Sequence, residues 1–106
     1  MGGNSPDPSG RTRDASQVRV RVIVEGRVQG VLFRHHTREM ALQLNLKGWV
    51  KNRRDGSVEA VFEGEKEKVE QILKWCRRGP SEARVTEVHT FWEDYTGVFE
   101  DFSINY

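Results

Sequence analysis

The spacing of apolar residues changes across the short segment 26–34, from every second residue to the spacing of a helical face. This change constrains the fold more than any other feature of the sequence. Before the segment, valines stand at every second position, 18, 20, 22 and 24, which is the pattern of a half-buried strand. After it, small and apolar residues share one helical face, namely Phe33, Thr37, Ala41 and Leu44. A strand must therefore run into a helix through a connection that is bounded by Gly26 and Gly30.

This connection has the parts of an anion-binding loop. A turn leaves backbone N–H groups free, and the first N–H groups of a helix have no acceptor within it. Arg34 stands at the predicted helix start, where its planar guanidinium can hold two phosphate oxygens. The spacing alone leaves a second interpretation open, a tight connection without a ligand, because glycine first of all supplies backbone freedom.

The remaining patterns complete one α+β domain. Strands are predicted over 46–53 and 57–63 around a turn at Asp55-Gly56, and a helix over 65–78 stops at Gly79-Pro80. Strands over 84–92 and 99–106 follow. This order predicts a ferredoxin-like βαββαβ sandwich, an antiparallel-rich sheet with two helices on one face and a short extra C-terminal strand.

Residues 1–17 differ from the rest of the chain. They are rich in Gly, Pro and Ser and show no apolar period, so a disordered tail or a remnant added for expression is expected there. The folded domain is expected to cover 18–106. The segment has no apolar core of a secretory signal, so a cytoplasmic location is the default expectation.

Composition excludes several classes of function. Seventeen Lys and Arg face sixteen Asp and Glu, and this balance argues against nucleic-acid binding driven by bulk charge. Cys76 is the only cysteine, so no internal disulfide or cysteine-based metal cage can form. No apolar run approaches the ~18 residues of a membrane span, so no membrane partner is expected.

Several separated motifs in the chain resemble those of acylphosphatases, small enzymes that hydrolyse carboxyl-phosphate anhydrides. The similarity begins at 26–34 (GRVQGVLFR) and continues at 48–52 (GWVKN), 55–58 (DGSV) and 102–106 (FSINY). It covers residues 18–106, with the motifs in the same order. The resemblance implies an enzyme that acts on small acyl phosphates without a metal or other cofactor. A monomer is expected, although the sequence leaves the oligomeric state open.

The resemblance also assigns the site. It implies that Arg34 binds the phosphate and that Asn52 orients the attacking water. The leaving group is a carboxylate whose acid has a pKa of about 4, so it departs without a general acid, and phosphoryl transfer depends mostly on positioning and electrostatics. The predicted phosphate-binding residues are Arg27, Val28, Gln29, Gly30, Val31, Leu32, Phe33 and Arg34.

Other interpretations remain beside this one. The same topology hosts non-catalytic modules that bind phosphorylated ligands or RNA, although the strand at 58–63 lacks the basic, glycine-spaced aromatic run of an RNA reader. Arg27 is either a solvated turn residue or a charge that attracts an anionic substrate. The effect of Leu32 on the acyl side, and the acceptor of the water's proton, are also open.

The histidines carry less signal. His35 and His36 follow Arg34, but neighbours on a helix point about 100° apart, so both cannot face one site. Both are expected to face solvent. His89 lies in the predicted fourth strand, and because no clustered partner is evident in the sequence, no metal role is expected for it.

Overall fold

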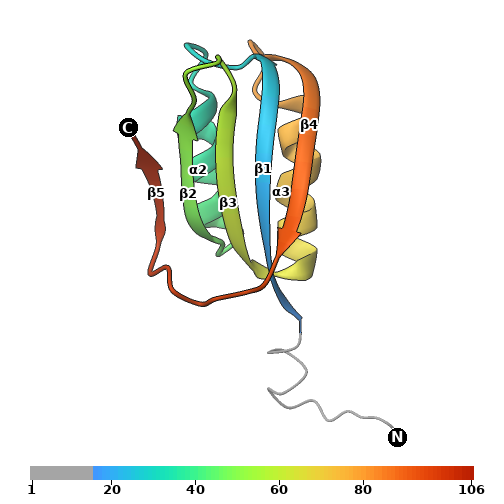
Figure 1. The fold of residues 1–106 in the computed structure, drawn as a ribbon, viewed down its shortest axis with the longest axis vertical. Helices are drawn as coiled ribbons and strands as arrows, with labels where there is room; N and C mark the ends of the chain where they lie inside the picture. Colours follow the sequence, from blue (N-terminus) through green and yellow to red (C-terminus); the bar gives the residue numbers. More distant parts are fainter. Residues whose placement is uncertain (1–15) are drawn as a thin grey trace, which may run out of the picture.

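The helices and strands follow one another in the predicted order and form the α+β, ferredoxin-like sandwich (Figure 1). The computed structural model describes residues 16–106. Its elements are β1 (Gln17–Arg27), α2 (Phe33–Gln43), β2 (Lys47–Asn52), β3 (Val58–Glu65), α3 (Lys66–Arg78), β4 (Arg84–Glu93) and β5 (Phe102–Asn105). β1 thus begins one residue before the expected domain start, while residues 1–15 of the expected tail lie outside the described residues.

The five strands form one sheet in the order β4-β1-β3-β2-β5. All neighbours are antiparallel except β2 and β5, which are parallel. Both helices cover the same face of the sheet (Figure 1). The valines at 20, 22 and 24 are buried in the core, as their alternation predicts. Because β1 pairs with β3 in antiparallel fashion, the loop that leaves β1 for α2 lies at the same end of the sheet as the β2–β3 turn.

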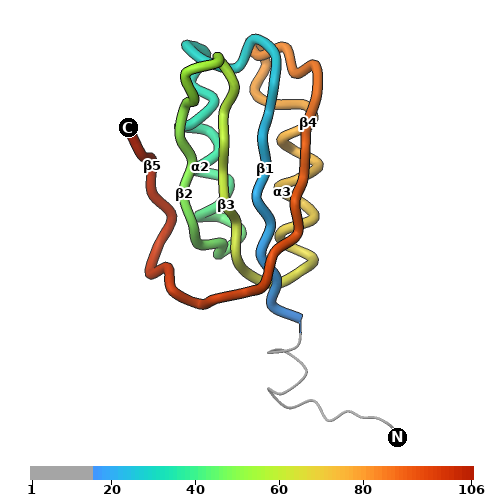
Figure 2. The backbone as a smooth tube through the Cα atoms, viewed as in Figure 1, coloured from blue at the N-terminus to red at the C-terminus, as the bar shows by residue number. Residues whose placement is uncertain are grey.

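The last strand is shorter than the predicted 99–106. After β4 the chain crosses one end of the sheet to reach the opposite edge, where β5 pairs with β2 (Figure 2). The buried carboxylate of Glu63 holds this crossing segment. It accepts hydrogen bonds from the Thr96 backbone N–H (3.0 Å), the Thr96 hydroxyl (2.7 Å) and the Gly97 N–H (3.0 Å). Residues 94–101 therefore cannot join the sheet as a strand.

The Glu63 carboxylate couples the crossing segment to pH. Burial by itself raises the pKa of Glu63, but hydrogen bonds from Thr96 and an ion pair with Arg19 at 3.1 Å outweigh burial and keep the pKa below its usual value. A lowered pKa stabilises the fold at pH values above about 4.3, the carboxyl's ordinary value, and this contribution disappears as pH falls through the folded-state pKa.

We expect Glu63→Gln to lower the free energy of unfolding at pH 7 by roughly 1.5–3 kcal/mol, the range for hydrogen bonds to a charged group. The difference between variant and wild type should shrink toward pH 3, measured by urea unfolding. Glu59→Gln is the matched control, because Glu59 lies on the same strand and pairs with Arg21 at 3.3 Å in a more exposed position. An equal loss at both pH values would contradict the role of the charge.

In residues 16–106, no helix is both long and apolar enough to cross a membrane.

Candidate active site

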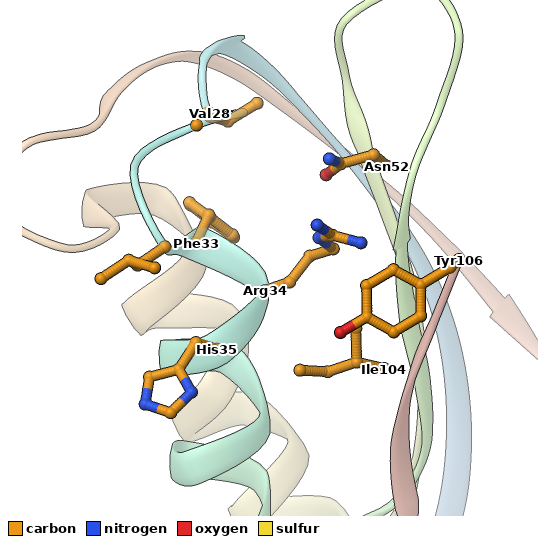
Figure 3. A pocket seen from close by; sticks show the side chains of 9 residues that line it. Val28, Phe33, Arg34, His35, Asn52, Ile104 and Tyr106 are labelled. Atoms are coloured by element: carbon orange, nitrogen blue, oxygen red, sulfur yellow. The ribbon is translucent and has the colours of Figure 1, made fainter.

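A cavity of about 380 Å³ opens between the β1–α2 loop, the end of β2 and the C-terminal strand (Figure 3). Three segments that lie far apart in the sequence supply its walls. The lining residues are Val28, Gly30, Leu32, Phe33, Arg34, His35, Asn52, Ile104 and Tyr106. The cavity therefore brings together the two residues that the resemblance assigns to catalysis, Arg34 and Asn52.

The start of α2 presents free backbone donors at this cavity. The first intrahelical bond runs from the His36 N–H to the Leu32 carbonyl at 3.0 Å, so the N–H groups of residues 33–35 have no acceptor within the helix. No side chain caps this end, and the first turn holds no acidic residue. An uncapped helix start with its positive dipole end is suited to an anion.

The loop before the helix contains two residues in the left-handed region. Gly30 has φ 78°, which glycine adopts without strain. Leu32 has φ 61° and ψ 25°, a conformation that costs a residue with a Cβ atom about 1–2 kcal/mol. The fold maintains this conformation because the residues on either side, Val31 and Phe33, are anchored in the hydrophobic core. Backbone strain of this kind is concentrated at functional sites.

Gln29 fixes the loop against the neighbouring hairpin. Its side-chain amide donates to the carbonyls of Arg53 at 2.8 Å and Ser57 at 2.9 Å. These two carbonyls belong to the turn that directly follows Asn52. The Gln29 side chain does not line the cavity; it sets the distance between the loop and the strand end that carries Asn52.

The Arg34 guanidinium retains most of its donors. One nitrogen, Nη1, donates weakly to the Asn105 carbonyl at 3.5 Å, and Cζ lies 4.9 Å from the centre of the Tyr106 ring. No carboxylate forms an ion pair with Arg34 within residues 16–106. The cation is therefore oriented by β5 and by Tyr106, which follows it, while its charge remains available to a ligand.

The Asn52 side chain points toward Arg34 (Figure 3). Its Oδ1 atom is buried and has no hydrogen-bond partner. A buried acceptor without a partner costs about 1–3 kcal/mol, so it marks a place where a water or ligand donor is expected. Asn52 is the last residue of β2, where the strand ends beside the loop that Gln29 ties down.

The structure separates the predicted phosphate-loop residues into two groups. Val28, Gly30, Leu32, Phe33 and Arg34 line the cavity, whereas the side chains of Arg27, Gln29 and Val31 do not. Val31 belongs to the core. Arg27 ends β1 opposite Arg84 and lines a different hollow together with residues 81–84.

Three lining residues were not among the predicted site residues: His35, Ile104 and Tyr106. His35 lines the cavity, but its ring is exposed and points away from Asn52 (Figure 3). Ile104 and Tyr106 reach the site only because β5 pairs with β2 in parallel. No local pattern in the sequence reveals that pairing; the only signal was the similarity of the final five residues to the family motif.

The expectation that His89 has no clustered partner is wrong. Its Nε2 atom lies 3.0 Å from a carboxylate oxygen of Glu25 and 3.2 Å from one of Glu87. The three residues are on β1 and β4, and none of them lines the cavity that holds Arg34.

Comparisons with known proteins identify the family of this chain and agree with its fold. Residues 20–104 match the family model described as Acylphosphatase. The chain is 52% identical over 89 residues to an acylphosphatase of Pelotomaculum thermopropionicum, covering 84% of this chain and 97% of that protein. It is 54% identical over 92 residues to an acylphosphatase of Aeropyrum pernix, covering 86% and 91%.

Solved structures give the same result. An acylphosphatase from Coxiella burnetii superposes with a TM-score of 0.83 and 34% identity, over 88% of this chain and 97% of that one. The Bacillus subtilis acylphosphatase superposes with a TM-score of 0.81 and 36% identity, over 84% and 99%.

Proposed function

Because the chain belongs to the acylphosphatase family and hydrolyses acyl phosphates, we propose that the cavity at Arg34 and Asn52 is its active site. The phosphate group of the substrate sits on the free N–H groups of residues 33–35 and on the Arg34 guanidinium. The acyl group extends toward the opening of the cavity, where solvent can receive the released carboxylate.

The loop and Arg34 act on the charge of the phosphoryl group. The oxygens of this group carry charge that redistributes as the anhydride bond breaks, and fixed N–H donors stabilise it without reorganising. Arg34 adds a planar donor pair whose orientation is set by the Asn105 carbonyl and the Tyr106 ring. Site and substrate are complementary in charge, because no carboxylate among residues 16–106 neutralises this arginine.

Asn52 holds the attacking water. The water donates a hydrogen bond to Oδ1, the buried acceptor that lacks a partner, and this is the single observation that carries the proposal. The held water attacks phosphorus on the side opposite the acyl oxygen. Its oxygen forms the new P–O bond as the P–O bond to the acyl group breaks, and the carboxylate leaves with the electron pair.

The reaction needs no general acid and no metal in this proposal. The carboxylate leaving group is the conjugate base of an acid with a pKa of about 4, so it departs as an anion at neutral pH. The proton of the attacking water passes to an oxygen of the phosphate or of the departing carboxylate.

Release of phosphate from acetyl phosphate in excess chelator tests this proposal. We expect full turnover in about 1–10 mM EDTA, since no step depends on a bound cation. The assay is run on the whole chain after dialysis against the chelator, with benzoyl phosphate as a second substrate. Turnover that disappears with chelator and returns with added Mg²⁺ or Zn²⁺ would overturn the metal-free mechanism.

A further inference from the structure

A histidine and two glutamates converge on the sheet face opposite the helices. The valines of β1 at 20, 22 and 24 point into the core, so Glu25 points to the other face. Glu87 of β4 stands directly opposite Glu25 in the ladder, and His89 lies two residues further on the same face. The three ligand atoms lie within 4.8 Å of one another.

The spacing of these atoms suits one small divalent cation. The His89 Nε2 atom lies 3.0 Å from Glu25 Oε2 and 3.2 Å from Glu87 Oε1. Two ligand atoms that bind Zn²⁺ tetrahedrally at about 2.0–2.1 Å are roughly 3.3 Å apart. The two separations from the His89 nitrogen are close to that value, and the two carboxylate oxygens lie within 4.8 Å of each other, so side-chain movements of this size complete the geometry.

The charges of the cluster favour a cation. Like charges directly opposite each other on neighbouring strands destabilise a sheet, and Glu25 and Glu87 are such a pair. A neutral imidazole can donate at most one hydrogen bond from Nε2, so it cannot serve both carboxylates equally. A divalent ion, in contrast, attracts both carboxylates and the nitrogen lone pair together. The two carboxylates match the charge of the ion.

The site is open to solvent. The side chains of His89, Glu25 and Glu87 are 41%, 50% and 64% exposed, so a metal can enter and a water can fill the fourth position. Imidazole with carboxylates is a ligand set of zinc, whereas Mg²⁺ and Ca²⁺ are bound by oxygen alone. The backbone beneath is rigid, because both strands are hydrogen-bonded along the ladder.

We propose that Glu25, Glu87 and His89 bind Zn²⁺ on the outer face of the sheet. The ion cross-links the edge strand β4 to the central strand β1, next to the bulge at Glu25/Gly26 and just before the phosphate loop begins. The site stabilises the fold and is separate from catalysis, since none of its ligands lines the catalytic cavity.

Calorimetric titration of the metal-free whole chain with Zn²⁺ alone, at pH 7.5, tests the site. We expect one ion per chain, and binding at least about tenfold weaker in His89→Gln and in Glu25→Gln. His36→Gln is the matched control, because His36 is another surface histidine near a carboxylate, that of Glu39 at 3.7 Å, and its loss should leave the titration unchanged.

Thermal unfolding gives a second readout. Zinc at about a hundred times the wild-type Kd should raise the Tm of the wild type and of His36→Gln by more than it raises the Tm of His89→Gln. Three results would overturn the site. One is unchanged zinc affinity in His89→Gln, and another is an equal loss of affinity in His36→Gln. The third is that zinc does not bind the wild type at concentrations up to about 1 mM. The last result would leave hydrogen bonding between β1 and β4 as the role of the cluster.

Discussion

Arg34→Ala lowers kcat/KM for acetyl phosphate by about 10²-fold or more, the loss typical for one preorganised transition-state donor. The guanidinium is lost from the cavity, while the helix N–H groups remain. Inhibition by inorganic phosphate should weaken in the same variant, because the arginine binds the ground-state phosphate as well. Steady-state kinetics with phosphate as competitive inhibitor measure both effects.

Arg38→Ala is the matched control. Arg38 lies one turn further along α2 and, like Arg34, contacts the backbone of β5, through a bond to the Phe102 carbonyl at 3.3 Å. It does not line the cavity. We expect its activity to stay within about threefold of wild type, the scale of a change of under 1 kcal/mol. Near-normal turnover in Arg34→Ala would show that Arg34 does not stabilise the transition state, and equal losses in both variants would show that Arg34 acts through the fold alone.

Asn52→Ala lowers kcat by about 10²-fold while phosphate inhibition changes little. The reason is that Oδ1 is buried without a partner in the protein and, in the proposed mechanism, accepts a hydrogen bond from the attacking water and does not bind the phosphate. The separation of the two effects distinguishes a residue that orients water from one that binds substrate. Steady-state rates and the phosphate inhibition constant are measured for each variant.

Lys51→Ala serves as the control for Asn52, since Lys51 is the neighbouring residue on β2 and its amine pairs with Glu59 at 4.0 Å. It should behave as wild type. If phosphate inhibition weakens in Asn52→Ala as much as kcat falls, the amide binds the phosphate and the assignment of the water to Oδ1 is wrong.

The parts of the fold that could be predicted from the sequence are those determined by residues within a single segment. The alternating valines specify β1, and the helical face from Phe33 specifies α2, because burial of one face follows directly from the period. Asn45 follows the first helix in the left-handed conformation, with φ 58°, that asparagine tolerates at helix ends. The course of residues 94–101 could not be predicted, because it depends on the Glu63 carboxylate 31 or more residues earlier.

The site shows the same division. Arg34 and Asn52 could be named from the motifs, but their partners could not. Gln29 holds the loop through two carbonyls 24 and 28 residues away, and Tyr106 reaches Arg34 through the parallel pairing of β5 with β2. The grouping of His89 with Glu25 and Glu87 depends on the register of β1 against β4, which no single strand reveals.

A crystal structure of the chain with bound phosphate tests the central claim most directly. We expect the anion in the cavity, with oxygens about 2.7–2.9 Å from the Arg34 guanidinium and in reach of the N–H groups of residues 33–35. A water bound to Asn52 Oδ1 should lie in line with phosphorus. Phosphate bound elsewhere, with the cavity empty and Arg34 and Asn52 turned away from each other, would contradict the mechanism.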